Sequence, residues 1–564
     1  MSAQAEQGPS ESSNGNSQKK QPTRKGNRPS EAEIEAKRKE RAEKKEREAK
    51  EKERQAKLGI SGIGKDGKIP FAVREWSKMK DISQERIQGR QRVRILSWNI
   101  LAQGLVRRKL FPNSDCLKWK DRQSGLTSEM ISHNWDLGAF QEVDRIDVHG
   151  PNLQQSGRNY VYAKGYNDKQ HGLMIAWRTK EQNIESDSAI FQQEPVASKV
   201  IFFDRESVDT DSDTQKDGKR LALSRVTRNI ALFVALRFKD QSRKGPKGII
   251  ISTAHLFWHP MHAYERVRQM GIMKRRLISW RKEHGEEWSD WPLFLSGDFN
   301  DQPHSATYRL VTGKPITQHC LDEVLKSTVV HQSVDELKEK VESDDLAKVN
   351  GQEIIANGNA AQQDASGPGN EEEEDEEEED PNEEEEGEDD QILKNCRIAK
   401  CEDALLTIEE FVQLHDLSQP PPKSEPPSVD GNKDKSTDWI DHVIKLGLQS
   451  AYGDHFNNLE VDQKGNYFSS PERFRERHDD IDWTPNTPNP HLELKSFEPM
   501  YTLYSPLFSL TLDYIFLYPD QDTQNSPIIT GLLPTHKTEI LRPGLPRKYA
   551  CASDHIPIGA EMMI

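Results

Sequence analysis

The chain has few cysteines and no long apolar run, and both shortages narrow what the protein can be. Its five cysteines form no CxxC pair and no regular framework, which argues against a zinc site or a disulfide-stapled fold and favours a reducing compartment. No stretch approaches the length of a membrane-spanning helix, and the polar start MSAQAEQGPS lacks the apolar region of a signal peptide. We therefore expect an intracellular protein, cytoplasmic or nuclear or both, with no membrane segment.

Hydrophobic residues are also scarce. Only 33% of the 564 residues are hydrophobic and 30% are charged, a balance that predicts a folded domain diluted by disordered segments. The formal net charge of −16 is concentrated in one place, because residues 371–390 contain 17 Asp or Glu and no Lys or Arg. Taking these 17 acids away changes the net charge from −16 to +1. The acidic composition is therefore compatible with a polyanionic substrate.

Residues 1–65 have no pattern of buried positions and are predicted to form a basic tail, either disordered or a single solvated helix. Residues 18–57 hold 16 Lys or Arg against 9 Glu. Opposite charges four residues apart, such as Glu40 and Lys44, support an isolated helix. Because an apolar stripe is missing, a coiled coil is not expected. The tail is either a solubilising segment or an arm for RNA contact or nuclear targeting.

The folded region is predicted to run from residue 90 to residue 564. Short apolar segments rich in β-branched and aromatic residues predict strands. Residues 262–284 repeat apolar positions every three or four residues, which predicts an amphipathic helix packed on a sheet. Strands mixed with helices indicate a layered α/β domain. The predicted strands are 93–98, 172–177, 230–238, 248–258, 292–296 and 511–518.

One long segment interrupts this domain. Residues 333–435 lose apolar periodicity, contain the acidic block and approach their end in a run of prolines, which predicts a disordered insertion. Core-like sequence returns at 439–452 and again from Leu492. The insertion is either a surface loop that is tolerated because long loops cost little stability, or a segment that binds a basic partner or screens out the wrong RNA.

Several apolar segments end in polar residues, and rigid strand ends can hold a precise site. Asp298 and Asn300 follow the run 292–295 and lie on one side of an extended backbone. The carboxylate can orient or deprotonate a water, and the amide can hold that water or a phosphate oxygen. Taken alone, Asp and Asn after a strand are more often turn formers.

Three further polar residues stand at or inside apolar runs. Glu142 is costly to bury without a partner, so it binds either a divalent cation or, as is more common for a lone Glu, an Arg. Asn99 ends another run, and by itself it could equally satisfy a backbone group. Asp513 lies inside an apolar run and requires a metal, an Arg or a nearby His.

Two histidines could supply positive charge. Asp554 and His555 are neighbours, so that the acid could fix the tautomer of the ring. A charged imidazolium can stabilise a phosphorane-like transition state or protonate a leaving oxygen. His255 emerges from the apolar run 248–252 and could add a second cationic donor, although a lone His in that position more often has a structural role.

Together, the motifs SWNILAQ, FQEVD, HGLMIAW, TAHLFWHP, SGDFNDQP, LDYIFLY and SDHIPI resemble those of the endonuclease/exonuclease/phosphatase superfamily. The resemblance covers 90–330 and 436–564, and it is closest to the branch of the carbon-catabolite-repressor deadenylases, Nocturnin, Angel and the Ngl-type RNA exonucleases. It implies a four-layer α/β sandwich with two packed mixed β-sheets flanked by helices. It also implies Mg²⁺-dependent cleavage of a phosphodiester, with Mn²⁺ as the alternative cation.

The resemblance implies a role for each polar residue. Glu142 would be the principal metal ligand, with Asn99 and Asp513 completing its surroundings. Asp298 would position or activate the attacking water, and Asn300 would hold the scissile phosphate. The remaining implied residues are His555 for the developing charge, Asp554 for orienting that His or a second ion, His255 for phosphate, and Asn229 where the family has a site Asn.

The chain also departs from parts of this pattern. Its first 90 residues contain no leucine-rich repeat, the docking surface of the deadenylases, so that membership of their large complex is not expected. His171 and Gly172 replace the Asp-Gly of many deadenylases, which is closer to the Ngl type. Leu503 replaces the usual Asn after the EPMYT element.

The leading interpretation is a Mg²⁺-dependent 3′–5′ exoribonuclease that trims RNA 3′ ends, either ribosomal RNA precursors or poly(A). One alternative within the same superfamily is a Nocturnin-like phosphatase acting on a nucleotide such as NADP. A DNA-repair endonuclease fits the flanking motifs less well. The alternative from another class is a catalytically idle protein whose tail and acidic insertion bind RNA or protein partners.

Overall fold

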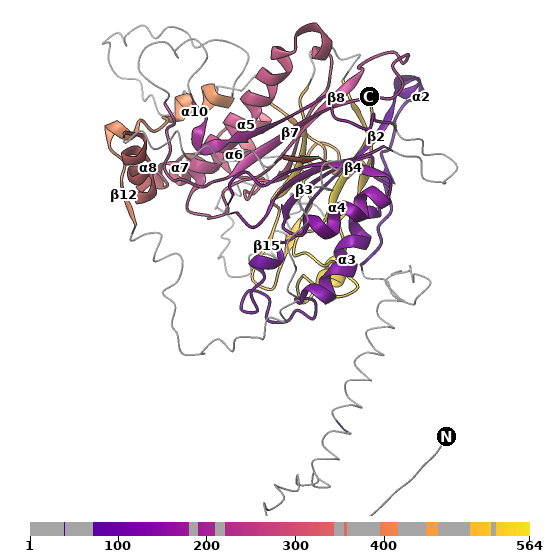
Figure 1. The fold of residues 1–564 in the computed structure, drawn as a ribbon, viewed down its shortest axis with the longest axis horizontal. Helices are drawn as coiled ribbons and strands as arrows, with labels where there is room; N and C mark the ends of the chain where they lie inside the picture. The colour runs from indigo at the N-terminus through magenta and orange to yellow at the C-terminus, as the bar shows by residue number, and fades with distance from the viewer. Residues whose placement is uncertain are drawn as a thin grey trace, which may run out of the picture. The chain divides into compact units, whose positions relative to one another are not determined.

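Two β-sheets lie face to face at the centre of the molecule (Figure 1). The computed structural model describes residues 39, 71–167, 169–179, 190–208, 220–342, 355–357, 395–415, 447–460, 497–519 and 526–564. The first sheet has the strand order β1 (Ser77–Lys78), β17 (Ile528–Leu533), β18 (Ile558–Met563), β2 (Arg92–Asn99), β3 (Leu137–Val143), β5 (Gly172–Arg178), β4 (Arg158–Ala163) and β11 (Ile355–Asn357). The second has the order β13 (Gln449–Ser450), β16 (Asp513–Leu517), β9 (Leu293–Asp298), β8 (Gly248–His255), β7 (Ile230–Arg237) and β6 (Ala197–Phe202).

Both sheets are mixed, because each contains one parallel pair among antiparallel neighbours. In the first sheet β2 runs parallel to β3, and in the second β8 runs parallel to β9. The inner faces meet in one apolar cluster to which the first sheet contributes Ile95 and Ile175 and the second contributes Val234 and Phe294. Because both faces of these strands are covered, their sequences are continuous apolar runs.

Helices cover the outer face of each sheet and complete four layers (Figure 1). The eight-stranded sheet carries α3 (Trp119–Ile131) and α4 (Ile146–Gln155). The six-stranded sheet carries α5 (Ala263–Glu283), α6 (Ala306–Thr312) and α7 (Gln318–Lys326). The predicted four-layer sandwich is thereby confirmed. No helix in the described part of the chain is long and apolar enough to cross a membrane.

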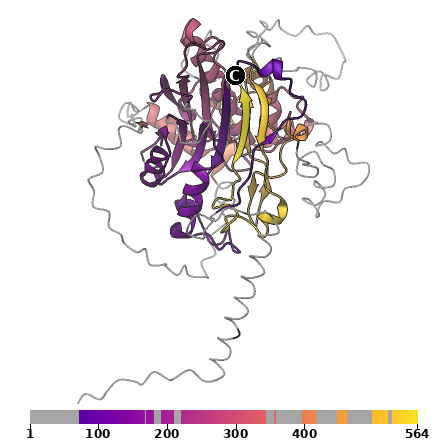
Figure 2. The same cartoon turned by 90° about the vertical axis from the view of Figure 1, so that its right-hand side faces the viewer.

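The predicted strands are all found, with small differences at their ends. The predicted segment 248–258 stops being a strand at His255, where β8 ends. The predicted segment 292–296 corresponds to β9, which runs on to Asp298 and so carries that acid as its last residue. Turning the view by 90° shows the yellow C-terminal strand β18 beside β2, with which it pairs in antiparallel register (Figure 2).

The predicted helix 262–284 is α5, but it is buried far more completely than an amphipathic surface helix. Arg268, expected on another face from the apolar stripe, is fully buried and lies 3.0 Å from Glu265, with its other nitrogens donating to the carbonyl of Phe203. Its charge is therefore compensated inside the protein, as a buried guanidinium requires. The sequence pattern predicted the helix and one buried face, but not that a second face of the helix is also covered.

A helix from the predicted insertion supplies that cover. In α10 (Ile408–His415), Phe411 and Leu414 pack into the same core cluster as α5. The two helices approach closely at Gly271, where a Cβ atom would lie 2.6 Å from the Leu414 side chain. Lys274 on α5 donates to the carbonyl of His415 at 2.7 Å.

The predicted bounds 333–435 for the disordered insertion are therefore too wide at both ends. Besides α10, this range contains most of α8 (Gln332–Glu342) and all of β12 (Cys396–Ile398), which pairs with β10 (Val329–His331). The physical reason is that the few apolar residues on either side of the acidic block suffice for packing: Phe411 and Leu414 pack on α5, and Val334 packs with Leu223 and Val330. The acidic block itself lies outside the described residues, and its disorder stays a prediction.

The start of the folded region also differs from the prediction of residue 90. Strand β1 pairs with β17 at the edge of the eight-stranded sheet, and Phe71 is already buried. Of residues 1–70, Lys39 alone is described, as an exposed helical residue. The predicted basic tail 1–65 otherwise lies outside the described residues.

Candidate active site

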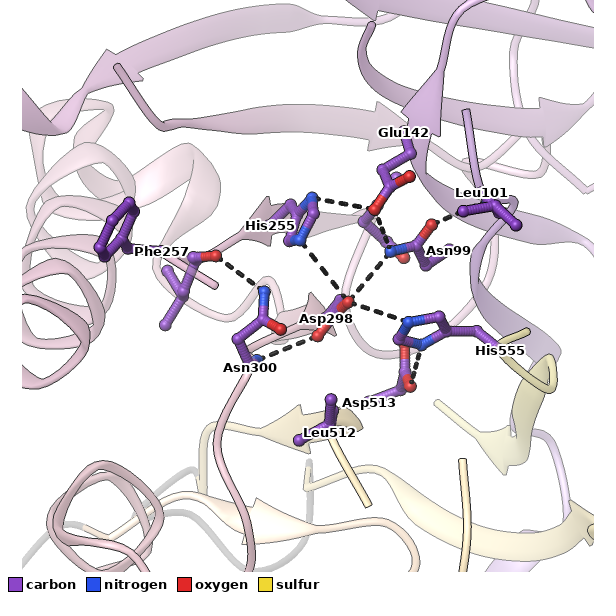
Figure 3. Close-up of polar contacts among 12 residues, drawn as sticks. Asn99, Leu101, Glu142, His255, Phe257, Asp298, Asn300, Leu512, Asp513 and His555 are labelled. Atoms are coloured by element: carbon purple, nitrogen blue, oxygen red, sulfur yellow. Dashed lines mark hydrogen bonds and ion pairs between the residues drawn. The ribbon is translucent and has the colours of Figure 1, made fainter. Parts of the chain in front are cut away.

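The ends of five strands bring the predicted polar residues together at one edge of the two sheets (Figure 3). The parallel pairs place Asn99 and Glu142 near the ends of β2 and β3, and His255 and Asp298 at the ends of β8 and β9. Strand β16 runs antiparallel to β9, so that its first residue, Asp513, stands directly opposite Asp298. Residues that are far apart in the sequence therefore form one cluster.

Glu142 is aimed by an irregularity in its strand. The pairing of β3 with β5 shifts between Phe140 and Val143, and Glu142 has a φ of 57°, in the left-handed region that non-glycine residues rarely adopt. Its Oε1 accepts a hydrogen bond from Asn99 Nδ2 at 2.8 Å, and its Oε2 accepts one from the backbone N–H of Ala102 at 2.9 Å. The carboxylate is held at two points.

Glu142 is kept ionised by its neighbours. Burial alone would raise the pKa of this carboxyl group, but the charge of His255 and the hydrogen bonds from Asn99 and Ala102 lower the pKa below its usual value. Its Oε1 lies 3.7 Å from His255 Nδ1. The alternative of a salt bridge to an Arg is not found in the described part of the chain.

Asp298 is the residue on which the cluster converges. Its Oδ2 accepts a hydrogen bond from Asn99 Nδ2 at 3.0 Å and lies 3.5 Å from His555 Nε2 and 3.7 Å from His255 Nε2. Its Oδ1 accepts from the backbone N–H of Asn300 at 2.9 Å. The preceding Gly297 is required here, because a Cβ atom would lie 2.1 Å from a backbone oxygen of β8.

His555 is oriented by Asp513 rather than by its neighbour in the sequence. Nδ1 of His555 lies 2.8 Å from Asp513 Oδ2, and Trp98 Nε1 donates to the His555 carbonyl at 2.9 Å. Burial by itself lowers the pKa of His555, but the charges of Asp513 and Asp298 raise the pKa well above its usual value. The ring is therefore an imidazolium at neutral pH.

Asp554 does not hydrogen-bond to the His555 ring, whose Nδ1 meets Asp513 instead, and its role in orienting that His or a second ion stays a prediction. It is buried, and the hydroxyl of Ser553 contacts its Oδ1 at 3.4 Å. Burial raises its pKa, and the charge of Glu142 acts in the same direction. The chain turns between Ser553 and His555, so the two adjacent side chains face different partners.

The remaining predicted residues lie at the rim of the cluster. Asn300 has a φ of 49°, and its Nδ2 donates to the carbonyl of Leu256 at 2.9 Å. Nδ2 of Asn229 donates to the carbonyl of His255 at 2.8 Å, while its buried Oδ1 has no hydrogen-bond partner. His255 itself retains 16% exposure of its side chain. Both amides thus brace the segment after β8.

Two residues that support the site were missed from the sequence. Arg122, buried in α3, donates to the carbonyls of Ile100 and Leu101 at 2.8 and 2.6 Å and to that of Ala552 at 2.9 Å. It therefore ties the segment after Asn99 to the segment before His555. No local pattern marks this role, because an Arg in a polar helix normally faces water.

Thr502 is the second residue that the sequence reasoning missed as a support. Its hydroxyl oxygen accepts hydrogen bonds from the backbone N–H groups of Leu512 and Asp513 at 2.9 and 3.0 Å. Its carbonyl accepts from the N–H of Ile556, the residue after His555. The EPMYT element, noted for its resemblance, thus connects the acid and the His of the pair, and that resemblance was the signal that could have found it.

The donor set suits a hard divalent cation. Asp513 Oδ1 is buried without a hydrogen-bond partner, and an unpaired carboxylate oxygen is costly unless a cation or water meets it. Ligand atoms of Asp298, Asp513 and His555 lie within 4.8 Å of one another, but a protonated His555 cannot coordinate a cation, so the carboxylates alone would do so. Carboxylate oxygens, including those of Glu142, are the ligands that Mg²⁺ and Mn²⁺ prefer. As placed here, Asn99 acts as a donor to both acids, while its oxygen accepts from Leu101 N.

Comparison with known proteins gives one family and several relatives. Residues 96–317 match the sequence pattern of the Endonuclease/Exonuclease/phosphatase family. RNA exonuclease NGL2 of Saccharomyces cerevisiae is 33% identical over 246 residues, which are 40% of this chain and 43% of that protein. A probable RNA exonuclease of Schizosaccharomyces pombe is 32% identical over 257 residues, 44% of each chain. The matches therefore span less than half the length of these relatives.

A solved structure, that of ANGEL2, a 2′,3′-cyclic phosphatase, is 16% identical to this chain with a TM-score of 0.45, and the comparison covers 88% of this chain and 99% of that one.

The match to the family's sequence pattern ends at residue 317, before β16. Asn99, Glu142, His255 and Asp298 lie inside the matched range, whereas Asp513 and His555 reach the cluster through the fold.

Proposed function

Because the chain carries a domain of the endonuclease/exonuclease/phosphatase family, we propose that it is a metal-dependent phosphodiesterase that removes nucleotides from RNA 3′ ends. The observation that carries this proposal is the placement of His555. Held by Asp513, it directs Nε2 toward Asp298 at 3.5 Å, and Asn99 joins Asp298 to Glu142. The choice of RNA rests on the relatives that are named RNA exonucleases.

Each residue has a defined task in hydrolysis of the terminal phosphodiester. Asp298 accepts a proton from the water that attacks phosphorus. Asn300 holds the scissile phosphate, and His255 contacts the same group. The bond from phosphorus to the 3′ oxygen of the preceding nucleotide breaks, and the His555 imidazolium stabilises the developing charge, which is the task of a preorganised cation. Glu142 would hold Mg²⁺ or Mn²⁺, which would supply positive charge against the phosphate oxygens.

A time course on single-stranded RNA labelled at its 5′ end tests the proposal. We expect a ladder that shortens from the 3′ end with Mg²⁺ and no cleavage with EDTA. Release of internal fragments first would contradict the 3′–5′ polarity. Comparing a poly(A) 3′ end with a ribosomal RNA precursor 3′ end on the same gel identifies which substrate is shortened faster.

The second candidate, a nucleotide phosphatase, is tested with the same protein. Incubation with NADP is followed by measuring released inorganic phosphate. Phosphate release with the RNA left intact would favour the phosphatase over the exonuclease. An Asp298→Ala variant that retains the cellular phenotype of the wild type would instead favour the idle interaction protein.

A further inference from the structure

A group of cations and aromatic rings lies outside the residues assigned above. Tyr166 follows β4, and the guanidinium groups of Arg205 and Arg228 lie 5.4 and 5.1 Å from the centre of its ring. Arg205 also lies 4.5 Å from the ring centre of Phe202. We call Tyr166, Arg205 and Arg228 the basic cluster. Both guanidinium groups therefore lie over the face of one aromatic ring, which places them close to each other.

The backbone that carries the basic cluster is fixed. Arg228 has a φ of 59°, an uncommon value for a residue other than glycine. Asp204 is buried, and its carboxylate accepts hydrogen bonds from the N–H of Arg228 at 2.6 Å and from the N–H and hydroxyl of Thr227 at 3.2 Å. This acid therefore holds the backbone, and both of its oxygens are occupied.

The basic cluster adjoins the active site on the side of His255 and Glu142. Asn229, which follows Arg228, donates to the carbonyl of His255 at 2.8 Å. A strand of RNA that leaves the acidic site in this direction meets the guanidinium groups of Arg205 and Arg228.

We propose that Arg205 and Arg228 bind the phosphate groups of the single-stranded RNA that leads into the site. This inference rests on the proposed function and adds to it the path of the substrate. Guanidinium groups bind phosphate with paired hydrogen bonds, and rings that stack on them fix their planes. Contacts of this kind position the strand without reading its sequence.

The experiment measures binding of a single-stranded RNA, long enough to pass the basic cluster, by fluorescence anisotropy in EDTA at increasing KCl. The full-length variants are Arg205→Ala and Arg205→Ala with Arg228→Asn, because Asn tolerates the left-handed backbone at position 228. Arg86→Ala is the matched control, because Arg86 is exposed in α2 (Gln84–Ile87), before the start of β2, whereas the site lies at the end of that strand.

For single strands, each lost phosphate contact lowers the slope of log affinity against log salt by about 0.7. The double variant should therefore lose about 1.4 from the slope, so that between 50 and 200 mM salt the wild type weakens about sevenfold more than the variant. Arg205→Ala should keep its turnover of a dinucleotide, which has a single phosphodiester and no further strand, and should raise KM for the long RNA.

Two results would overturn the inference. One is a salt slope and an affinity of the double variant equal to those of Arg86→Ala. The other is a loss of dinucleotide turnover in Arg205→Ala as large as its loss on long RNA, which would place Arg205 at the scissile bond. Failure of the proposed function is separate: wild-type protein would then leave RNA uncut with Mg²⁺, while the anisotropy comparison would remain interpretable.

Discussion

Glu142 and Glu498 are both buried carboxyl groups, 6% and 1% exposed, yet their pKa values are shifted in opposite directions. Burial raises the pKa of Glu498 to about 7, because the hydroxyl donors Ser450 and Tyr308 offset only part of the cost of losing water. Glu142 faces the same cost, but an imidazole, an amide and a backbone N–H lower its pKa. Removal from water therefore does not decide which acid carries charge.

The difference teaches what distinguishes the candidate site from an ordinary buried polar pocket. In the pocket around Glu498, neutral hydroxyl groups satisfy a carboxyl group whose pKa of about 7 leaves both its protonated and its ionised form populated at neutral pH. In the site, two histidines lie among three acids, so that charge is retained where a phosphate and a cation would meet it. The predictions below test whether that charge, rather than burial, is what the site depends on.

The largest effect is expected for Asp298→Asn, which removes the charge on which the cluster converges. Turnover of RNA should fall by roughly 10³- to 10⁴-fold, the upper range for loss of a general base. The melting temperature should stay close to that of the wild type, because the substitution also removes repulsion between Asp298 and Asp513. Unfolding of this variant, seen by circular dichroism, would mean that Asp298 is structural.

The next largest effect is expected for His555→Gln, which keeps a polar side chain but removes the imidazolium. Turnover should fall by roughly 10²- to 10³-fold, as for loss of one preorganised donor to a developing charge. Affinity for uncut RNA measured in EDTA should change much less. An equal loss in binding and turnover would place His555 in substrate binding instead.

Asp513→Asn and Asp554→Asn compare the two acids that could orient His555. The raised pKa of His555 keeps it protonated below that value, so wild-type activity is present at neutral pH and is lost as the pH rises through it. Without Asp513, the larger of these two influences on that pKa, the alkaline limb of the pH–rate profile should move to lower pH. Asp554→Asn should move the alkaline limb less. A shift as large as that of Asp513→Asn, or larger, would indicate that Asp554 orients His555.

The smallest effect on activity is expected for Glu498→Gln, which should leave turnover within about twofold and change stability instead. The folded pKa of Glu498 is raised from 4.5 to about 7, so its contribution to the free energy of unfolding is complete below pH 4.5 and is lost as the pH rises to 7. Between pH 5 and pH 8 the wild type should therefore lose roughly 2 kcal/mol relative to the variant. Urea unfolding of both proteins at the two pH values measures this difference, and parallel curves would show that Glu498 is ionised throughout.

Much of the fold and the residue content of the site could be predicted from the sequence, because strand ends are marked locally. An apolar run followed by a polar residue is visible without a structure, and Asn99, Glu142, His255 and Asp298 were all located in that way. The same runs gave the strands, since buried parallel and antiparallel strands are apolar on both faces.

The pairing of residues within the site could not be predicted in the same way. Asp513 meets His555 because β16 and the segment before β18 are brought together by the sheets, and Asp554 was the obvious partner only because it is adjacent in sequence. Arg122 carries no signal because its partners are backbone carbonyls from two distant segments. Helix α10 was not predicted, because its few apolar residues lie in a polar segment that follows the acidic block.

The position of β18 has a consequence for the order in which the protein can be made. This strand lies inside the eight-stranded sheet between β17 and β2, although β2 is synthesised more than four hundred residues earlier. A nascent chain must therefore keep the apolar edge of β2 unpaired on that side until residues 558–563 have left the ribosome. His555 arrives with the same segment, so the contact between Asp513 and His555 forms only when the last strand of the sheet is in place.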